Sequence, residues 1–213
     1  MWFAKQRLAV AQLLVVRPKY TRMNLFADFQ VKNVDLPPLD ASTGLKIREA
    51  EEGDLGALAQ IAAEREGTTQ NIKRRQFEKQ LFQQQGAGDF MILVAEVKRE
   101  IVGFGKCGFF TPPDGAPANV APEGWYLMGV IVIPAFRRRR VASQLTRARL
   151  GWLARHASKA YYFASALNRV SIELHQTFGF VEVTRDFWFP KTTFTGEVGI
   201  LFETDLKSRR YDA

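Results

Sequence analysis

The amino-acid sequence predicts a mixed α/β domain, and three observations lead to that prediction. Strand-like and helix-like segments alternate from Leu45 onward, as they do in folds that cover a sheet with helices. Continuous apolar runs such as residues 125–133 are typical of buried strands. Between these runs, apolar residues recur at three- and four-residue spacing, which is the pattern of amphipathic helices.

Residues 1–44 precede this pattern and are expected to form an N-terminal extension that ends in a proline-containing linker. Lys5 and Arg7 stand before an apolar run, as they would in a targeting segment. That run has about half of the ~20 residues that a membrane span needs, and no small-x-small cleavage pattern follows it. We therefore expect an added helix or a loosely ordered extension, no membrane span and a cytoplasmic location. The domain is placed over 45–206 and a tail over 207–213.

The first part of the domain is expected to contain one strand and two helices. The strand covers residues 45–50, and the helices cover 51–65 and 71–85. Acidic residues open the first of these helices, where they stabilise the positive end of the helix dipole. Apolar residues recur in both helices at helical spacing, so each should pack one face on a sheet.

A hairpin, a long loop and a buried strand are expected next. The apolar segments 90–97 and 101–110 flank the polar tripeptide Lys98-Arg99-Glu100, which is a hairpin pattern. Residues 111–124 are rich in proline and glycine, and a loop of that length usually has a function or is disordered. Residues 125–133 then form a continuous apolar run, which predicts a central strand.

The second part of the domain is expected to begin with a helix after the arginine run. Val141, Leu145, Ala148 and Trp152 fall on one apolar stripe of that helix. Strands are then expected over 160–167, 180–189 and 196–206, and a helix over 168–179 that is capped by Asn168 and stopped by Gly179.

The charge balance favours an anionic partner. The chain has 30 Lys and Arg against 22 Asp and Glu, which gives a net charge of +8. Nucleic acid, a membrane surface and a phosphate-rich cofactor are all compatible with that excess. The four consecutive residues Arg137–Arg140 concentrate it. One cysteine and two histidines predict no internal disulfide and no metal site.

Two segments carry a family resemblance. VIVIPAFRRRRVASQL, residues 130–145, resembles the acyl-CoA-binding motif of the GNAT superfamily of N-acyltransferases. In that motif, a strand that ends near a proline is followed by [Q/R]-x-x-G-x-[G/A] at a helix start, which here falls on 137–142. NRVSIELHQTFGF resembles the second signature of the superfamily. That signature is an asparagine, a tyrosine seven residues later and a glycine-phenylalanine pair, and it is matched by Asn168, His175, Gly179 and Phe180.

The resemblance covers roughly residues 45–206 and implies both a fold and an activity. The fold is a central mixed, mostly antiparallel, twisted sheet of six to seven strands flanked by about four helices. The activity is transfer of an acetyl group from acetyl-CoA to a primary amine of a small molecule or a protein. A pyrophosphate suits the arginine turn, because a helix N-terminus offers unpaired N–H groups and a partial positive charge.

The resemblance also implies a set of site residues. Backbone groups of the strand before the motif would contact the acyl carbonyl and the pantetheine arm. The residues expected to bind the cofactor are Val130, Ile131, Val132, Arg137, Arg138, Arg139, Arg140, Val141, Ala142, Ser143, Asn168 and His175. Candidates for catalytic proton transfer are His175, Tyr126 and Glu123, with Glu96 on the hairpin as a further carboxylate. Apart from the resemblance, two interpretations of Glu64 and Glu66 stay open: they attract a cationic amine, or they only finish a helix.

Two residues depart from the family pattern. Arg140 stands where the first motif prefers glycine, and His175 stands where tyrosine is commonest. We expect Arg140 to adopt ordinary helical dihedrals in the first helical turn and to point outward. His175 would protonate the leaving thiolate only if a neighbour keeps its imidazole partly protonated, because its reference pKa is about 6.5.

Two alternatives to the enzyme stay open at this point. One is a non-catalytic acyl-CoA-binding or regulatory module, since both departures fall in the motifs. The other is a nucleic-acid-binding protein that uses the arginine run, although no aromatic-interleaved basic surface accompanies that run. The acceptor substrate is not identified by the sequence, and a homodimer is compatible with it.

Overall fold

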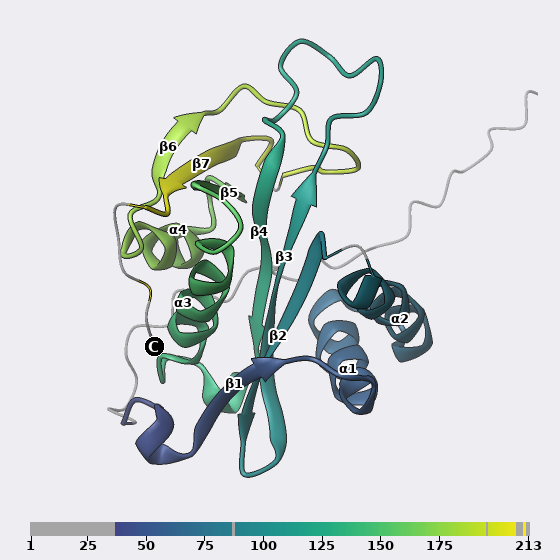
Figure 1. Cartoon of the computed structure of the whole chain (residues 1–213), viewed down its shortest axis with the longest axis vertical. Helices are drawn as coiled ribbons and strands as arrows, with labels where there is room; N and C mark the ends of the chain where they lie inside the picture. Colours follow the sequence, from purple (N-terminus) through teal and green to yellow (C-terminus); the bar gives the residue numbers. More distant parts are fainter. Residues whose placement is uncertain (1–36, 87, 195, 208–210, 212–213) are drawn as a thin grey trace, which may run out of the picture.

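A computed structural model describes residues 37–86, 88–194, 196–207 and 211 (Figure 1). The extension predicted for residues 1–36 lies outside the described residues. Within them, seven strands form one sheet in the order β1-β2-β3-β4-β5-β7-β6. All neighbouring strands are antiparallel except β4 and β5, which are parallel. The mixed, mostly antiparallel sheet expected from the sequence is confirmed.

The elements follow one another in the predicted order. The strands are β1 (Leu45–Glu49), β2 (Phe90–Val97), β3 (Glu100–Phe110), β4 (Gly124–Val132), β5 (Lys159–Ser165), β6 (Val181–Thr184) and β7 (Gly199–Asp205). The helices are α1 (Leu55–Glu66), α2 (Gln70–Gly86), α3 (Val141–Leu153) and α4 (Arg169–Gln176). Short 3₁₀ turns at Ala41–Thr43, Glu52–Asp54 and Pro134–Phe136 precede β1, α1 and the arginine run.

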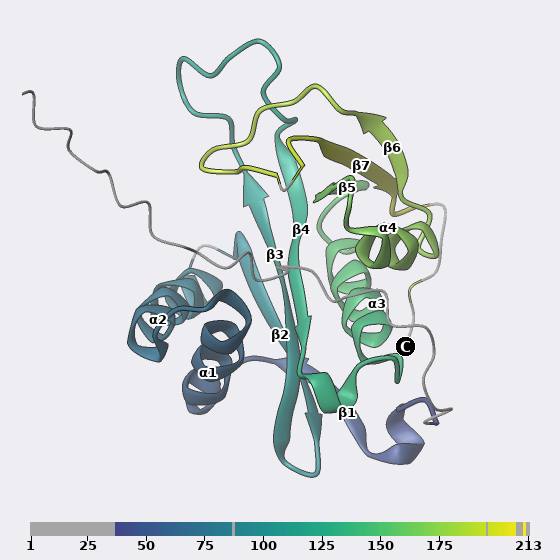
Figure 2. The ribbon, with the colours of Figure 1, turned by 180° about the vertical axis from the view of Figure 1, so that it is seen from behind.

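Helices cover both faces of the sheet. Helices α1 and α2 lie on one face and α3 and α4 on the other, as the two opposite views show (Figures 1 and 2). The first pair buries Leu58, Phe77, Ile92 and Phe104 among others. The second pair packs over a larger cluster that includes Leu145, Leu150, Tyr162 and Phe202. The sheet is therefore covered on both sides, which is why its central strands read as continuous apolar runs.

Several elements differ from the sequence prediction in their bounds: the helix predicted over 168–179 ends at Gln176, and the strand predicted over 196–206 begins at Gly199. The hairpin turn uses only Lys98 and Arg99, both with positive φ, and Glu100 already belongs to β3. Two residues with positive φ match the right-handed twist of the flanking strands better than a three-residue turn would. The strand predicted over 180–189 ends at Thr184, so that prediction was wrong for its second half.

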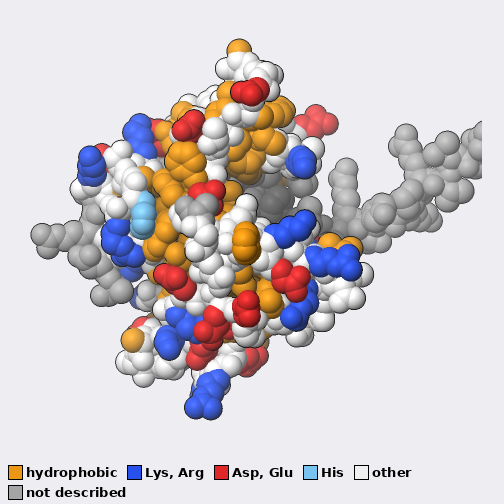
Figure 3. All heavy atoms as spheres, turned by 45° about the vertical axis from the view of Figure 1, so that its right-hand side comes forward, with side chains coloured by type: hydrophobic (Ala, Val, Ile, Leu, Met, Phe, Trp, Pro, Cys, Tyr) orange, Lys and Arg blue, Asp and Glu red, His pale blue; other side chains and the backbone are white. Residues whose placement is uncertain are grey.

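Residues beyond Thr184 leave the sheet and pair with the long loop after β3. The Ala121 N–H donates to the Trp188 carbonyl at 2.9 Å, and the Trp188 N–H donates to the Asn119 carbonyl at 2.8 Å. Phe187 and Phe189 pack into an aromatic cluster with Tyr126 rather than extending β6. On the face shown in Figure 3, hydrophobic side chains gather in the upper part and charged side chains mix below them.

Two segments outside the predicted domain limits pack on its core. Leu39 is only 4% exposed, and its N–H donates to the Arg139 carbonyl at 2.9 Å. Tyr211 is 6% exposed and lies against Gly151 of α3. In the part of the chain that the structure describes, no helix is both long enough and apolar enough to cross a membrane.

Candidate functional site

The arginine run forms a turn between β4 and α3. Helix α3 begins at Val141, so the four arginines precede it, and Arg140 is its N-cap. Arg138 and Arg140 both have left-handed backbones, with φ of 63° and 65°. The expectation that Arg140 uses ordinary helical dihedrals is therefore wrong. The structure keeps at Arg140 the backbone shape that a glycine adopts without strain, although the residue is an arginine.

The backbone of this turn presents a run of free N–H groups. Among the described residues, the six N–H groups from Arg138 to Ser143 have no hydrogen-bond acceptor, and no side chain caps α3. The first intrahelical bond is donated by Gln144 to the Arg140 carbonyl at 3.0 Å. Successive N–H groups around left-handed residues form a concave anion-binding nest, and the positive end of the helix dipole adds to it. This arrangement of N–H groups is the one with which helix termini bind anions.

The four arginine side chains divide into two kinds. Arg137 donates from Nε to the Val132 carbonyl at 3.0 Å, and Arg139 donates from Nε to the Pro37 carbonyl at 3.2 Å. These two side chains hold the turn against its neighbours. Arg138 and Arg140 are exposed. Their charges are therefore available to an anion in the solvent beside the turn.

An opening in the sheet lies directly before the turn. Strands β4 and β5 are paired at only one position, Tyr126 with Tyr161, and they diverge after it (Figure 1). Beyond that position, no strand among the described residues pairs with the β4 backbone over Val130–Val132 on its β5 side. The register of β4 against β3 shifts at the same place, so that Gly129 is an extra, exposed residue. A central strand with a bulge and an unpaired edge offers backbone groups to an extended ligand.

A buried arginine supports the bulge from the α3 side. Arg149 is 1% exposed, and its Nη1 donates to the carbonyls of Lys106 and Met128 at 3.0 and 3.1 Å. A Cβ at Gly105 would lie 2.9 Å from its Nε, so only glycine leaves room for this side chain. Burial lowers the pKa of the guanidinium to about 10, and it stays charged at neutral pH. Among the described residues, it has no carboxylate partner.

His175 lies near this arginine in an apolar environment. It is 4% exposed and stacks on Tyr162 with ring centroids 4.0 Å apart. Its Nδ1 lies 2.8 Å from the Ser171 carbonyl, so Nδ1 carries the proton. Burial, together with the charge of Arg149, lowers the pKa of His175 to about 3. The imidazole is therefore neutral at physiological pH, and no neighbour keeps it protonated.

The other predicted site residues lie apart from the turn. The Tyr126 hydroxyl donates to the Pro122 carbonyl at 2.7 Å, and burial raises its pKa. Glu123 is exposed just before β4. Asn168 caps α4 by accepting from the Ser171 N–H at 3.3 Å. The structure therefore brings Val130–Ser143 together at one opening and gives Asn168 a helix-capping contact.

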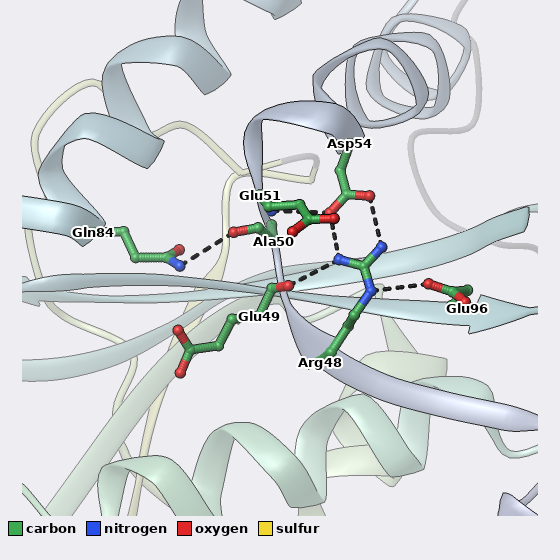
Figure 4. Close-up of polar contacts among 7 residues, drawn as sticks. All are labelled: Arg48, Glu49, Ala50, Glu51, Asp54, Gln84 and Glu96. Atoms are coloured by element: carbon green, nitrogen blue, oxygen red, sulfur yellow. Dashed lines mark hydrogen bonds and ion pairs between the residues drawn. The ribbon is translucent and has the colours of Figure 1, made fainter. Parts of the chain in front are cut away.

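Glu96 is held in an ion-pair network at the start of α1 (Figure 4). Arg48 donates from Nε to Glu96 at 2.9 Å and from its two Nη atoms to the two oxygens of Asp54 at 2.7 and 2.8 Å. Burial raises the pKa of Asp54, but the Arg48 and Glu51 hydrogen bonds outweigh it and leave that pKa lowered. The network joins β1, β2 and the turn before α1, which is a structural role for Glu96.

Three residues at the opening were missed in the sequence: Lys106, Gly129 and Arg149. Lys106 is the one charged residue inside the apolar run 101–110, and that isolation was a usable signal. Arg149 falls four residues after Leu145, in register with the buried stripe of α3. An arginine in that register is either strained or functional. Gly129 is the one glycine inside the apolar run 125–133, and an isolated glycine in a strand is a signal for a bulge.

Comparison with solved structures shows the same fold. A ribosomal-protein-alanine N-acetyltransferase from Brucella melitensis superposes with a TM-score of 0.57 at 24% identity, covering 75% of this chain and 99% of that one. YncA from Salmonella typhimurium, solved with its cofactor acetyl-CoA, gives a TM-score of 0.57 at 17% identity, covering 80% of this chain and 99% of that one. PaiA N-acetyltransferase from Thermoplasma acidophilum, in complex with coenzyme A, gives a TM-score of 0.54 at 14% identity, covering 76% of this chain and 98% of that one.

Sequence comparison adds the family. None of the curated proteins compared with the chain matches its sequence significantly. The family model for the acetyltransferase (GNAT) family, however, matches residues 57–180. That range holds most of α1, all of α2, α3 and α4, the opening beside β4 and the arginine turn. More than half of the chain is matched, and the chain therefore belongs to the acetyltransferase (GNAT) family of acyltransferases.

Proposed function

We propose that this protein transfers an acetyl group from acetyl-CoA to a primary amine, by direct attack of the amine on the thioester. The observation that carries the proposal is the run of six N–H groups over Arg138–Ser143, at the positive end of α3, that have no acceptor among the described residues. Coenzyme A contains a pyrophosphate, which is the anion that such a helix terminus binds. The exposed charges of Arg138 and Arg140 would strengthen that binding.

The opening between β4 and β5 suits the rest of the cosubstrate. Its backbone over Val130–Val132, apart from the Val132 carbonyl that accepts from Arg137, would hydrogen-bond the extended pantetheine arm, which leads from the turn toward Gly129. Acetyl-CoA supplies an acetyl group activated as a thioester. The buried charge of Arg149 behind the bulge would favour negative charge on the thioester oxygen, because fixed charge acts strongly where water is excluded.

The proposal gives His175 and Tyr126 packing roles. A histidine with a pKa near 3 is a neutral imidazole at neutral pH, and its one N–H is donated to the Ser171 carbonyl, so it does not act as the acid. The Tyr126 hydroxyl is already engaged with the Pro122 carbonyl. The proton released by the attacking amine would instead reach the departing thiolate through water at the exposed bulge.

Calorimetric titration with acetyl-CoA tests the cosubstrate assignment. We expect the double variant Arg138→Glu, Arg140→Glu to bind more than tenfold more weakly, because one charge-assisted hydrogen bond is worth about 1.5–3 kcal/mol. These two side chains are exposed, whereas Arg137 and Arg139 donate hydrogen bonds to backbone carbonyls. Replacing Arg137 or Arg139 would therefore disturb the turn itself. Arg155→Glu, at the far end of α3, is the matched control. Equal weakening in the control would contradict the assignment.

Release of free thiol tests catalysis. The protein with acetyl-CoA and a panel of primary amines should liberate CoA in proportion to the acetylated amine detected by mass spectrometry. Tight binding of acetyl-CoA without any such release would indicate a non-catalytic module instead.

A further inference from the structure

A small cavity lies on the α1 and α2 side of the sheet, at the bulge. Its volume is about 130 Å³. The walls come from α1, α2, β3 and β4, and the lining includes Glu66, Lys73, Gln76, Lys106 and Gly129. Gly129 is the bulge residue at which the proposed function places the thioester. The cavity therefore offers a space beside the bulge from which an acceptor could approach.

Charge in this cavity is positive on balance. Glu66, which the sequence suggested as an attractor of a cationic amine, forms an ion pair with Lys73. Lys73 also donates to the Gln76 side-chain oxygen at 3.0 Å. Glu66 is thus already neutralised, and it does not provide a free negative charge for a cation.

Lys106 supplies the remaining charge. Its Nζ lies 5.6 Å from the centroid of the Phe77 ring. Among the described residues, that Nζ has no carboxylate partner and no hydrogen bond. Burial lowers the pKa of Lys106, and the charge of Glu66, which raises that pKa, opposes burial more strongly than the charge of Lys73 adds to it. An anion beside Lys106 would reverse this cost, because an opposite charge favours the protonated form.

The size of the cavity limits what can enter. A volume of about 130 Å³ corresponds to about four water molecules at ~30 Å³ each. A carboxylate and the few atoms that join it to an amine fit that space, whereas a large substrate would reach it only with one end. The glutamine and lysine side chains around the cavity are hydrogen-bond donors, and a carboxylate can accept hydrogen bonds from them.

We propose that the acceptor is a small amino acid whose carboxylate binds Lys106 while its amine faces the bulge at Gly129. This proposal rests on the proposed function. In the reaction, the neutral amine forms the C–N bond, the C–S bond of the thioester breaks, and the proton lost by the amine is taken up by the CoA thiolate. The carboxylate is unchanged, so its only role is to bind and orient the amine.

Matched pairs of acceptors test the proposal: glycine, alanine and β-alanine, each against its amide. The amines of the amides have lower pKa values than those of the acids, so a larger fraction of them is unprotonated at neutral pH. The amides should therefore react faster unless the protein binds the carboxylate. We expect kcat/KM to favour the acids at least tenfold in the natural protein. Lys106→Met should remove that preference while leaving the Kd for acetyl-CoA within twofold. Lys46→Met, an exposed lysine on β1, is the matched control and should keep the preference.

A binding measurement separates this proposal from the proposed function. With CoA present, calorimetry should show that N-acetyl-β-alanine binds more tightly than its amide, and that Lys106→Met or Lys106→Gln abolishes the difference. Unaltered Tm values for the variants would show that they fold. If acetyl-CoA binds and neither kinetics nor calorimetry distinguishes acid from amide, the anionic acceptor is refuted and the acetyltransferase assignment stands. If acetyl-CoA itself does not bind, the proposed function fails and this proposal fails with it.

Discussion

Arg140→Gly is expected to make the protein more stable, even though it removes a side chain. Arg140 has φ of 65° and ψ of 4° at the N-cap of α3. A residue other than glycine costs roughly 1–2 kcal/mol in this left-handed region. Glycine removes that cost but raises the entropy of the unfolded chain by about 0.4–1 kcal/mol. The net gain is about 0.5–1 kcal/mol, or a Tm rise of about 1–4 °C for a domain of this size.

Arg140→Ala separates backbone strain from charge. Alanine removes the same charge as glycine but keeps a Cβ, so it should leave Tm unchanged or lower it. The assay is thermal unfolding of both variants in the same buffer, without acetyl-CoA. The Gln144 hydrogen bond to the Arg140 carbonyl is a backbone contact and survives in both. A Tm for the glycine variant that is no higher than that of the alanine variant would show that the turn is not strained.

Three further predictions concern buried polar groups. His175→Phe should keep kcat at saturating acetyl-CoA within a few fold, because the ring still stacks on Tyr162; a hundredfold loss would restore the histidine as an acid. Arg149→Met should lower the free energy of unfolding by about 2–4 kcal/mol in urea denaturation, since two buried carbonyls lose their donor. Arg48→Met should cost about 2 kcal/mol at pH 7. Because Asp54 has a lowered pKa in the folded protein, its stabilisation is complete above pH ~4 and is lost below it. The difference between Arg48→Met and the natural protein should therefore shrink as the pH falls below ~4, and a constant difference would exclude this coupling.

Much of the fold could be predicted because its elements are periodic. The stripe of α3 and the continuous run of β4 follow from burial on one or both faces, and burial leaves a clear pattern in the sequence. The start of α4 was also predictable, since Asn168 is its N-cap. Gly179 has φ of 82°, but it lies three residues after α4 ends at Gln176, and Thr177 is the C-cap. Such signals depend on nearest neighbours along the chain.

The features that were missed depend on contacts distant in sequence. Residues 185–189 have strand-like composition, but their aromatic rings are drawn into a cluster with Tyr126, about sixty residues earlier in the chain. The backbone of Arg140 cannot be read from an arginine, because that residue rarely adopts positive φ. The charge balance at Lys106 depends on the ion pair between Glu66 of α1 and Lys73 of α2. That contact joins two helices, so neither segment alone indicates it.

The contact between Leu39 and Arg139 orients a peptide plane. In a planar trans peptide, the carbonyl and the following N–H point in opposite directions. Because the Leu39 N–H holds the Arg139 carbonyl, the Arg140 N–H is turned outward, toward the place where an anion would sit. A chain shortened to begin at Leu45 would lose this restraint, and its 139–140 peptide could rotate away. The segment before the first strand thus restrains the orientation of the turn before α3.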